Sequence, residues 1–208
     1  LVRPLPPRPF ERRFETGAGQ QAQVDFAEFP VTFTAEPDIQ RKVWLFSMVL
    51  GHSRWLWGRF CPNQTLETVM RCHIAAFQTM GGACTEVLYD RMKTAVIGED
   101  ASGVVTYNVS LLALLAHYGS APRACQPYRA KTKGKVERPF RTIKEVHETL
   151  YHFHKPKDEE EANLWLRRAL VTYNNGDHRT ESHARIEDWL RHLPPDGVRA
   201  MCSWERFC

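Results

Sequence analysis

Apolar and polar positions divide the first third of the chain into three strand-like segments. Residues 21–33 alternate between apolar and polar side chains, which predicts a strand with one buried face. Residues 42–51 are almost continuously apolar, as expected for a central strand buried on both faces. Residues 54–61 follow after a short turn. Together the three segments predict an antiparallel meander.

The pattern changes to a helical period after Thr65. Apolar side chains then recur every three or four residues, and Gly81 with Gly82 marks the end of a predicted helix. The side chains predicted on its buried face are Leu66, Val69, Met70, His73, Ile74 and Phe77.

The remaining segments alternate strands with helices and end in helices. We expect a strand over 84–90, a loop from Ile97 to Gly103, a helix over 108–119 and a strand over 121–128. Further helices are expected over 135–150, 159–175 and 182–193. Antiparallel strands followed by this alternation predict an α/β fold, with a mixed sheet that carries helices on its faces.

Composition and the two ends of the chain bound its domain organisation. With 43% hydrophobic and 25% charged residues among 208, the chain is typical of a soluble globular domain. No apolar run reaches the roughly 18 residues of a membrane-spanning helix, and no signal-peptide core is visible. We therefore expect a soluble, intracellular protein. Residues 1–17 are expected to be a linker from a preceding region, 18–192 the core domain, and 193–208 the start of a following region.

The six cysteines are scattered and form no CxxC pair, so the sequence favours reduced thiols over a zinc site. Charge is uneven along the chain. The net charge is only +4, but between residues 123 and 144 eight basic residues accompany a single acid, Glu137. Such a block is typical of a surface that binds a phosphate backbone. On charge alone, a solvated surface is about equally good as an explanation.

Three acids stand out by their positions. Asp25 lies within an apolar strand, where an unpaired charge is costly. Asp90 ends the predicted strand 84–90, and Glu137 lies in the first turn of the predicted helix 135–150, just before Pro139. Each has an ordinary structural explanation: an ion-paired acid, a turn-initiating aspartate, and a helical pair with Arg141.

Taken together, the three acids suit metal-assisted phosphodiester chemistry. In-line attack on phosphorus needs an activated oxygen nucleophile and a stabilised leaving oxygen, and two hard cations supply both. Magnesium takes oxygen ligands, so carboxylates suit it better than histidine or cysteine.

The motifs that carry these acids resemble those of the DDE transposase and retroviral integrase core. They are QVDF at 23–26, LYDRMKTAV at 88–96 and KGKVERPFRTIKE at 133–145, in that order. Within the superfamily the chain is similar to IstA-type insertion-sequence transposases, over roughly residues 19–190. LGHSRW at 50–55 and YNNGDHRT at 173–180 support the resemblance.

The resemblance implies an RNase H-like fold with helices on both faces of the sheet, and Asp25, Asp90 and Glu137 as catalytic and metal-binding residues. It implies Mg²⁺ as cofactor, with Mn²⁺ able to substitute, for DNA 3′-end cleavage followed by strand transfer. The implied partners are transposon-end and target DNA, further copies of the same protein and an AAA+ ATPase helper. The implied location is the bacterial cytoplasm, at the nucleoid during transposition.

Basic residues beside the acids are expected to contact phosphates. These candidates are Lys93, Lys131, Lys133, Lys135, Arg138 and Arg141. Two other functions remain open at this point. One is a purely hydrolytic nuclease of the same fold, and the other is a non-catalytic DNA-binding or assembly module.

Overall fold

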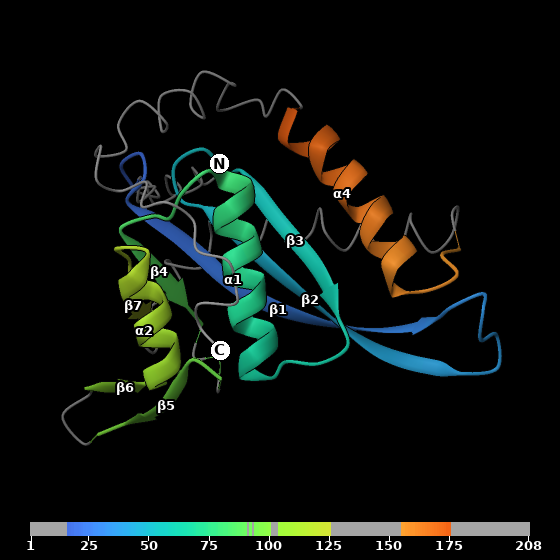
Figure 1. Ribbon diagram of the computed structural model, residues 1–208, viewed down its shortest axis with the longest axis horizontal. Helices are drawn as coiled ribbons and strands as arrows, with labels where there is room; N and C mark the ends of the chain where they lie inside the picture. The colour runs from blue at the N-terminus through green and yellow to red at the C-terminus, as the bar shows by residue number, and fades with distance from the viewer. Residues whose placement is uncertain (1–15, 91, 93, 101–103, 126–154, 176–208) are drawn as a thin grey trace, which may run out of the picture.

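The computed structural model of the protein describes residues 16–90, 92, 94–100, 104–125 and 155–175. Figure 1 shows a twisted sheet with helices packed against it. The elements, in chain order, are β1 (Gln21–Thr32), β2 (Gln40–Leu50), β3 (Leu56–Cys61), α1 (Leu66–Met80), β4 (Glu86–Tyr89), β5 (Val96–Glu99), β6 (Val105–Tyr107), α2 (Val109–His117), β7 (Ala121–Ala124) and α4 (Glu159–Asn175).

The main sheet has five strands in the order β3-β2-β1-β4-β7. β1, β2 and β3 pair antiparallel, whereas β4 pairs parallel with both β1 and β7. The predicted meander followed by parallel strands is therefore confirmed. The order also brings β1 and β4, which are distant in sequence, next to each other in the middle of the sheet.

Alternation along the strands gives the sheet two apolar faces. Ala22 and Val24 of β1 pack with α1 and α2, whereas Phe29 and Val31 of the same strand pack with α4. The first cluster contains Phe46, Phe77 and Tyr89, and the second contains Phe60, Leu166 and Leu170. Helices thus cover both faces, as predicted from the resemblance.

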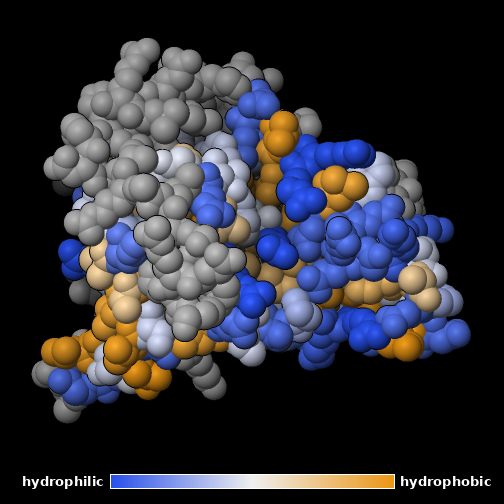
Figure 2. Space-filling view, viewed as in Figure 1, coloured by the Kyte–Doolittle hydropathy of each residue, from blue (hydrophilic) through white to orange (hydrophobic). Residues whose placement is uncertain are grey.

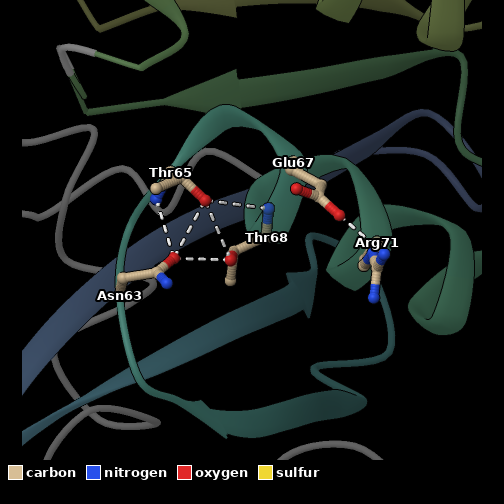
Figure 3. A network of polar contacts seen from close by, with 5 residues as sticks. All are labelled: Asn63, Thr65, Glu67, Thr68 and Arg71. Carbon is tan, nitrogen blue, oxygen red and sulfur yellow. Dashed lines mark hydrogen bonds and ion pairs between the residues drawn. The ribbon is translucent and has the colours of Figure 1, made fainter.

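Helix α1 begins and ends where the sequence predicts. The Thr65 side chain accepts a hydrogen bond from the Thr68 amide, which caps the first turn, and Gly81 ends the helix in the left-handed region at φ 79°. Asn63 extends the cap, because its Oδ1 accepts from the Thr65 amide at 3.1 Å and from the Thr68 hydroxyl at 2.6 Å. Figure 3 shows this network together with the Glu67–Arg71 ion pair one turn further on.

The prediction of a loop from Ile97 to Gly103 was wrong for its first residues. Residues Val96–Glu99 form β5, which pairs antiparallel with β6 as a small separate sheet. The β-branched residues Val96, Ile97, Val104 and Val105 explain the hairpin, since such side chains favour extended backbone. Ile97 and Val104 are more than half exposed, and Figure 2 shows an apolar corner over β5, β6 and α2.

Two asparagines of α4 cover the open edge of β3. The Asn163 side chain accepts from the Phe60 amide at 2.8 Å and donates to the Phe60 carbonyl at 3.0 Å. Asn174 makes the same pair of bonds with Leu56, both at 2.9 Å. Each side-chain amide therefore replaces the backbone of a neighbouring strand, and the edge is protected from pairing with another chain. Asn174 belongs to the YNN motif at 173–175.

The described cysteines Cys61, Cys72, Cys84 and Cys125 are buried and form no disulfide among themselves. Cys61 and Cys72 are in contact, with their sulfur atoms 3.5 Å apart. Within the part of the chain that the structure describes, no helix combines the length and the apolarity needed to cross a bilayer. The predicted helices over 135–150 and 182–193 lie outside the described residues.

Candidate active site

Asp25 lies in the middle of β1, at the centre of the sheet. It faces Ser47 of β2 in the antiparallel register and is half-buried. Its Oδ1 accepts a hydrogen bond from the Phe26 amide at 2.7 Å, and the Ser47 hydroxyl donates to its carbonyl at 3.3 Å. The strand pairing fixes the backbone on one side of Asp25, and the Phe26 amide orients its carboxylate.

Asp90 directly follows β4. The parallel register pairs Val24 with Tyr89, so the next residue of each strand is an aspartate. Neighbouring strands are about 4.8 Å apart, and paired residues of a parallel register point to the same face. The register thus pairs the residues that precede two acids 65 positions apart in the sequence.

Asp25 lies on the face opposite α1. Val24 and Tyr89 belong to the α1 cluster, so by alternation along β1 Asp25 projects from the other side of the sheet. Gln23 and Ser47 share that side and are buried, with 7% and 1% of their surface exposed. We call Gln23, Asp25 and Ser47 the polar strip. It interrupts the apolar face that α4 covers further along the sheet.

The third parallel strand ends at the same edge of the sheet. β7 pairs with β4 as far as Tyr89 and Ala124, and the Cys125 amide then donates to the Tyr89 carbonyl at 2.9 Å. Cys125 therefore lies next to the end of β4. Glu137 comes 12 positions after Cys125 in the sequence.

Glu137 itself lies outside the described residues, as do the basic candidates Lys93, Lys131, Lys133, Lys135, Arg138 and Arg141. Within the described ranges, no group of three or more histidine, cysteine, aspartate or glutamate side chains is gathered closely enough to hold a metal ion. Of the predicted triad, the structure therefore describes Asp25 and Asp90.

Two other acids near the strip have structural partners. Glu86 accepts hydrogen bonds from Gln21 at 2.6 Å and from Arg123 at 2.9 Å, which ties β1, β4 and β7 together. Glu28 forms an ion pair with Lys42 of β2 at 2.7 Å. The ordinary structural explanation therefore suffices for both glutamates. Arg123, the first residue of the basic block, is engaged in the same network.

Behind the polar strip, Tyr89 is hydrogen-bonded to His73 of α1. Its hydroxyl oxygen lies 2.8 Å from His73 Nε2, and both residues are fully buried. The helical period placed His73 correctly on the buried face of α1 but did not reveal this partner. The available signals were a histidine within an apolar stripe and a tyrosine next to an expected site aspartate.

Comparison with known proteins places the chain in a family. The family model "Integrase core domain" matches residues 15–130, more than half of the chain. The transposase for insertion sequence element IS640 of Shigella sonnei is 39% identical over 185 residues, which cover 88% of this chain and 50% of that protein. The IS21 transposase of Pseudomonas aeruginosa is likewise 39% identical over 185 residues, 88% of this chain and 41% of that protein.

A solved structure supports the fold independently. The catalytic core domain of HTLV-2 integrase, in a dimeric form in complex with magnesium, aligns with a TM-score of 0.54 at 14% identity, covering 74% of this chain and 86% of that chain. The present chain spans half or less of the length of the curated relatives named above. The matched model, the relatives and the shared architecture agree: the chain belongs to the integrase core domain family, has an RNase H-like fold and is related to the transposases of insertion-sequence elements.

Proposed function

We propose that this chain is the catalytic core of a DDE transposase that cleaves DNA at transposon 3′ ends and joins the freed ends to target DNA. The observation that carries the proposal is the parallel register of β1 and β4. It pairs Val24 with Tyr89, the residues that precede Asp25 and Asp90, and Ser47 lies opposite Asp25. We expect the two carboxylates to lie close together on backbone that strand pairing holds in place, which suits a site that must keep its ligands in position.

Asp25, Asp90 and Glu137 are the residues that would hold two Mg²⁺ ions. The donor set fits, because the polar strip offers carboxylate, hydroxyl and amide oxygens, which are the ligands of a hard cation. When bound, the ions would activate the attacking oxygen and stabilise the leaving oxygen of the phosphodiester. The protein would supply the spacing of Asp25 and Asp90 through the strand register, and the orientation of Asp25 through the Phe26 amide.

The partners that we propose follow from the same family. They are transposon-end and target DNA, further copies of the protein, and an AAA+ ATPase helper, acting in the bacterial cytoplasm at the nucleoid. Lys93 and the basic residues between 131 and 141 would contact the phosphate backbone. Neutralising them should weaken binding to all DNA sequences alike, since phosphate contacts carry no base information.

A strand-transfer assay tests the proposal. The substrates are a plasmid target and short duplexes from the DNA that flanks the coding sequence, with free 3′-hydroxyl ends, in Mg²⁺ or Mn²⁺. We expect joined products from the unaltered chain. Asp25→Asn, Asp90→Asn or Glu137→Gln should lower the rate at least about a hundredfold, because several kcal/mol of transition-state stabilisation are removed.

Asp38→Asn is the matched control, since Asp38 is an exposed aspartate in the β1–β2 turn. This variant should keep full activity. Hydrolysis of the duplexes without joining would favour the nuclease of the same fold. Unchanged activity after Asp25→Asn would show that Asp25 is not catalytic. DNA binding by the unaltered chain without cleavage or joining would favour the DNA-binding or assembly module.

A further inference from the structure

His73 and Tyr89 form a polar pair within the apolar cluster between α1 and the sheet. Neither residue is exposed to solvent. The His73 Nδ1 atom lies 2.7 Å from the Val69 carbonyl oxygen of α1, and its Nε2 atom lies 2.8 Å from the Tyr89 hydroxyl. The pair therefore links the backbone of α1, through one side chain, to the last residue of β4.

The direction of both hydrogen bonds follows from their chemistry. A carbonyl oxygen can only accept, so His73 Nδ1 carries the proton and donates to Val69. Burial lowers the pKa of His73 to about 4, so the ring is neutral near pH 7. Nε2 then accepts from the Tyr89 hydroxyl, whose own pKa is raised by burial. Each polar atom of the pair has one partner, and leaving any of them unpaired in this core would be costly.

Aromatic rings hold the imidazole in this orientation. Phe46 of β2 and Phe77 of α1 meet the His73 ring edge to face, with centroids 5.2 Å and 5.9 Å away. The ring cannot turn without clashing or losing both bonds, because protein cores are close-packed. α1 and β4 are consequently locked in one register, since a slip of either element would separate the Tyr89 hydroxyl from His73.

The hydrogen bond between Tyr89 and His73 is next to the proposed site, because Tyr89 directly precedes Asp90. Tyr89 packs toward α1 and Asp90 follows it, so a fixed Tyr89 ring restrains the backbone that carries the Asp90 carboxylate. After Asp90, the chain is held by a hydrogen bond to the residue just before the cap of α1. The Thr94 hydroxyl donates to the Gln64 carbonyl at 3.2 Å, and Ala95 is fully buried.

We propose that His73 and Tyr89 are positioning residues that hold Asp90 at metal-binding distance from Asp25. The proposal rests on the function proposed above and deepens it, because it assigns a role to two residues that would touch neither metal nor DNA. It predicts that metal affinity depends on a hydrogen bond on the far side of the sheet from the ions.

The test is Mn²⁺ binding to the purified chain, followed by water-proton relaxation, together with thermal unfolding of the metal-free chain. Tyr89→Phe removes the hydroxyl and keeps the ring. It should raise the Mn²⁺ concentration for half-saturation about tenfold, as for other groups that orient metal ligands indirectly. Tyr118→Phe is the matched control, since Tyr118 is a buried tyrosine of the same cluster that packs on Phe77. It should leave half-saturation unchanged.

Two further variants separate positioning from stability. His73→Gln keeps a donor and an acceptor and should recover part of the affinity that His73→Leu loses. The double variant His73→Leu, Tyr89→Phe leaves no unpaired polar atom, so its melting temperature should approach that of the unaltered chain while its Mn²⁺ affinity stays low.

Hydrogen exchange in the metal-free chain gives a readout that involves no ion. The backbone amides of β4 should exchange faster in Tyr89→Phe than in Tyr118→Phe. An unchanged Mn²⁺ concentration for half-saturation in Tyr89→Phe would overturn this inference. So would a double variant that recovers Mn²⁺ affinity together with its melting temperature. Neither result would affect the proposed function. Absence of Mn²⁺ binding by the unaltered chain would overturn the proposed function as well.

Discussion

The two faces of the sheet are built differently. The face under α1 and α2 is a continuous apolar cluster from Ala22 to Tyr118, with His73 enclosed in it. The face under α4 is apolar along β2, β3 and the hairpin end of β1, and it also carries the polar residues Gln23, Asp25 and Ser47. A single strand, β1, serves both faces. The difference indicates that the first face supports the second, where the proposed chemistry takes place.

The largest expected effect on stability comes from the supporting face. Phe46 is fully buried and its ring meets those of Phe26, Trp57 and His73 edge to face. Phe46→Ala should lower the free energy of unfolding by about 3–5 kcal/mol, through lost burial and a cavity. Phe29→Ala, at a residue of the α4 face that keeps 8% of its surface exposed, should cost less. Urea unfolding of both variants measures the two losses in the free energy of unfolding. Equal losses would contradict the view that the α1 face supports the α4 face.

The buried imidazole gives the supporting face a pH dependence. His73 has a folded pKa of about 4, below the ordinary value of 6.5, because burial disfavours its charged form. The unfolded chain therefore binds more protons between these values. The contribution of His73 to the free energy of unfolding is complete above about pH 6.5. It is lost as the pH falls, and the loss is on the order of 3 kcal/mol near pH 4.

Unfolding free energies between pH 7 and pH 4 measure this dependence. The groups that face His73 are the Tyr89 hydroxyl, which stays protonated in this range, and the rings of Phe46 and Phe77. His73→Gln removes the titrating group, so its stability should depend less on pH. An unchanged slope in that variant would assign the acid sensitivity to carboxylates elsewhere.

The sequence predicted the elements that depend on local pattern. The alternation around Val24, the apolar run of β2 and the glycine after α1 each have a local physical cause, and these elements formed as expected. The closeness of Asp25 to Asp90 is expected only from the family resemblance and stays a prediction. No local pattern encodes which strands become neighbours, and this placement depends on the register between β1 and β4.

The interactions that the sequence did not predict are those between distant residues. Asn163 and Asn174 appeared only as polar residues of a helix, because their partners Phe60 and Leu56 lie more than 100 positions away. The same holds for His73 and Tyr89. Glu137 and the basic candidates lie outside the described residues, so their roles stay predictions.

A smaller effect is expected at the edge of the α4 face. Asn163→Ala should lower the free energy of unfolding by about 1–3 kcal/mol, because the amide and carbonyl of Phe60 both lose their partner in a buried setting. Asn174→Ala should cost less, since its bonds to Leu56 are only partly buried. Asn175→Ala is the control at an exposed position of the same helix and should have almost no effect. If all three variants match the unaltered chain in urea unfolding, α4 does not stabilise β3 through these bonds.

The smallest effects are expected at the solvent rim of α1, where the cap and the ion pair of Figure 3 lie side by side. Thr65→Ala should cost about 1 kcal/mol, because the Thr68 amide and Asn63 lose their shared partner. Glu67→Ala should cost only a few tenths of a kcal/mol, since Glu67 and Arg71 are both more than half exposed and water screens their charges. Thermal unfolding at low and high salt separates the two contributions. The Thr65 effect should persist in salt and the Glu67 effect should vanish. A larger stability loss in Glu67→Ala than in Thr65→Ala would mean that ion pairing stabilises the start of α1 more than the capping hydrogen bonds do.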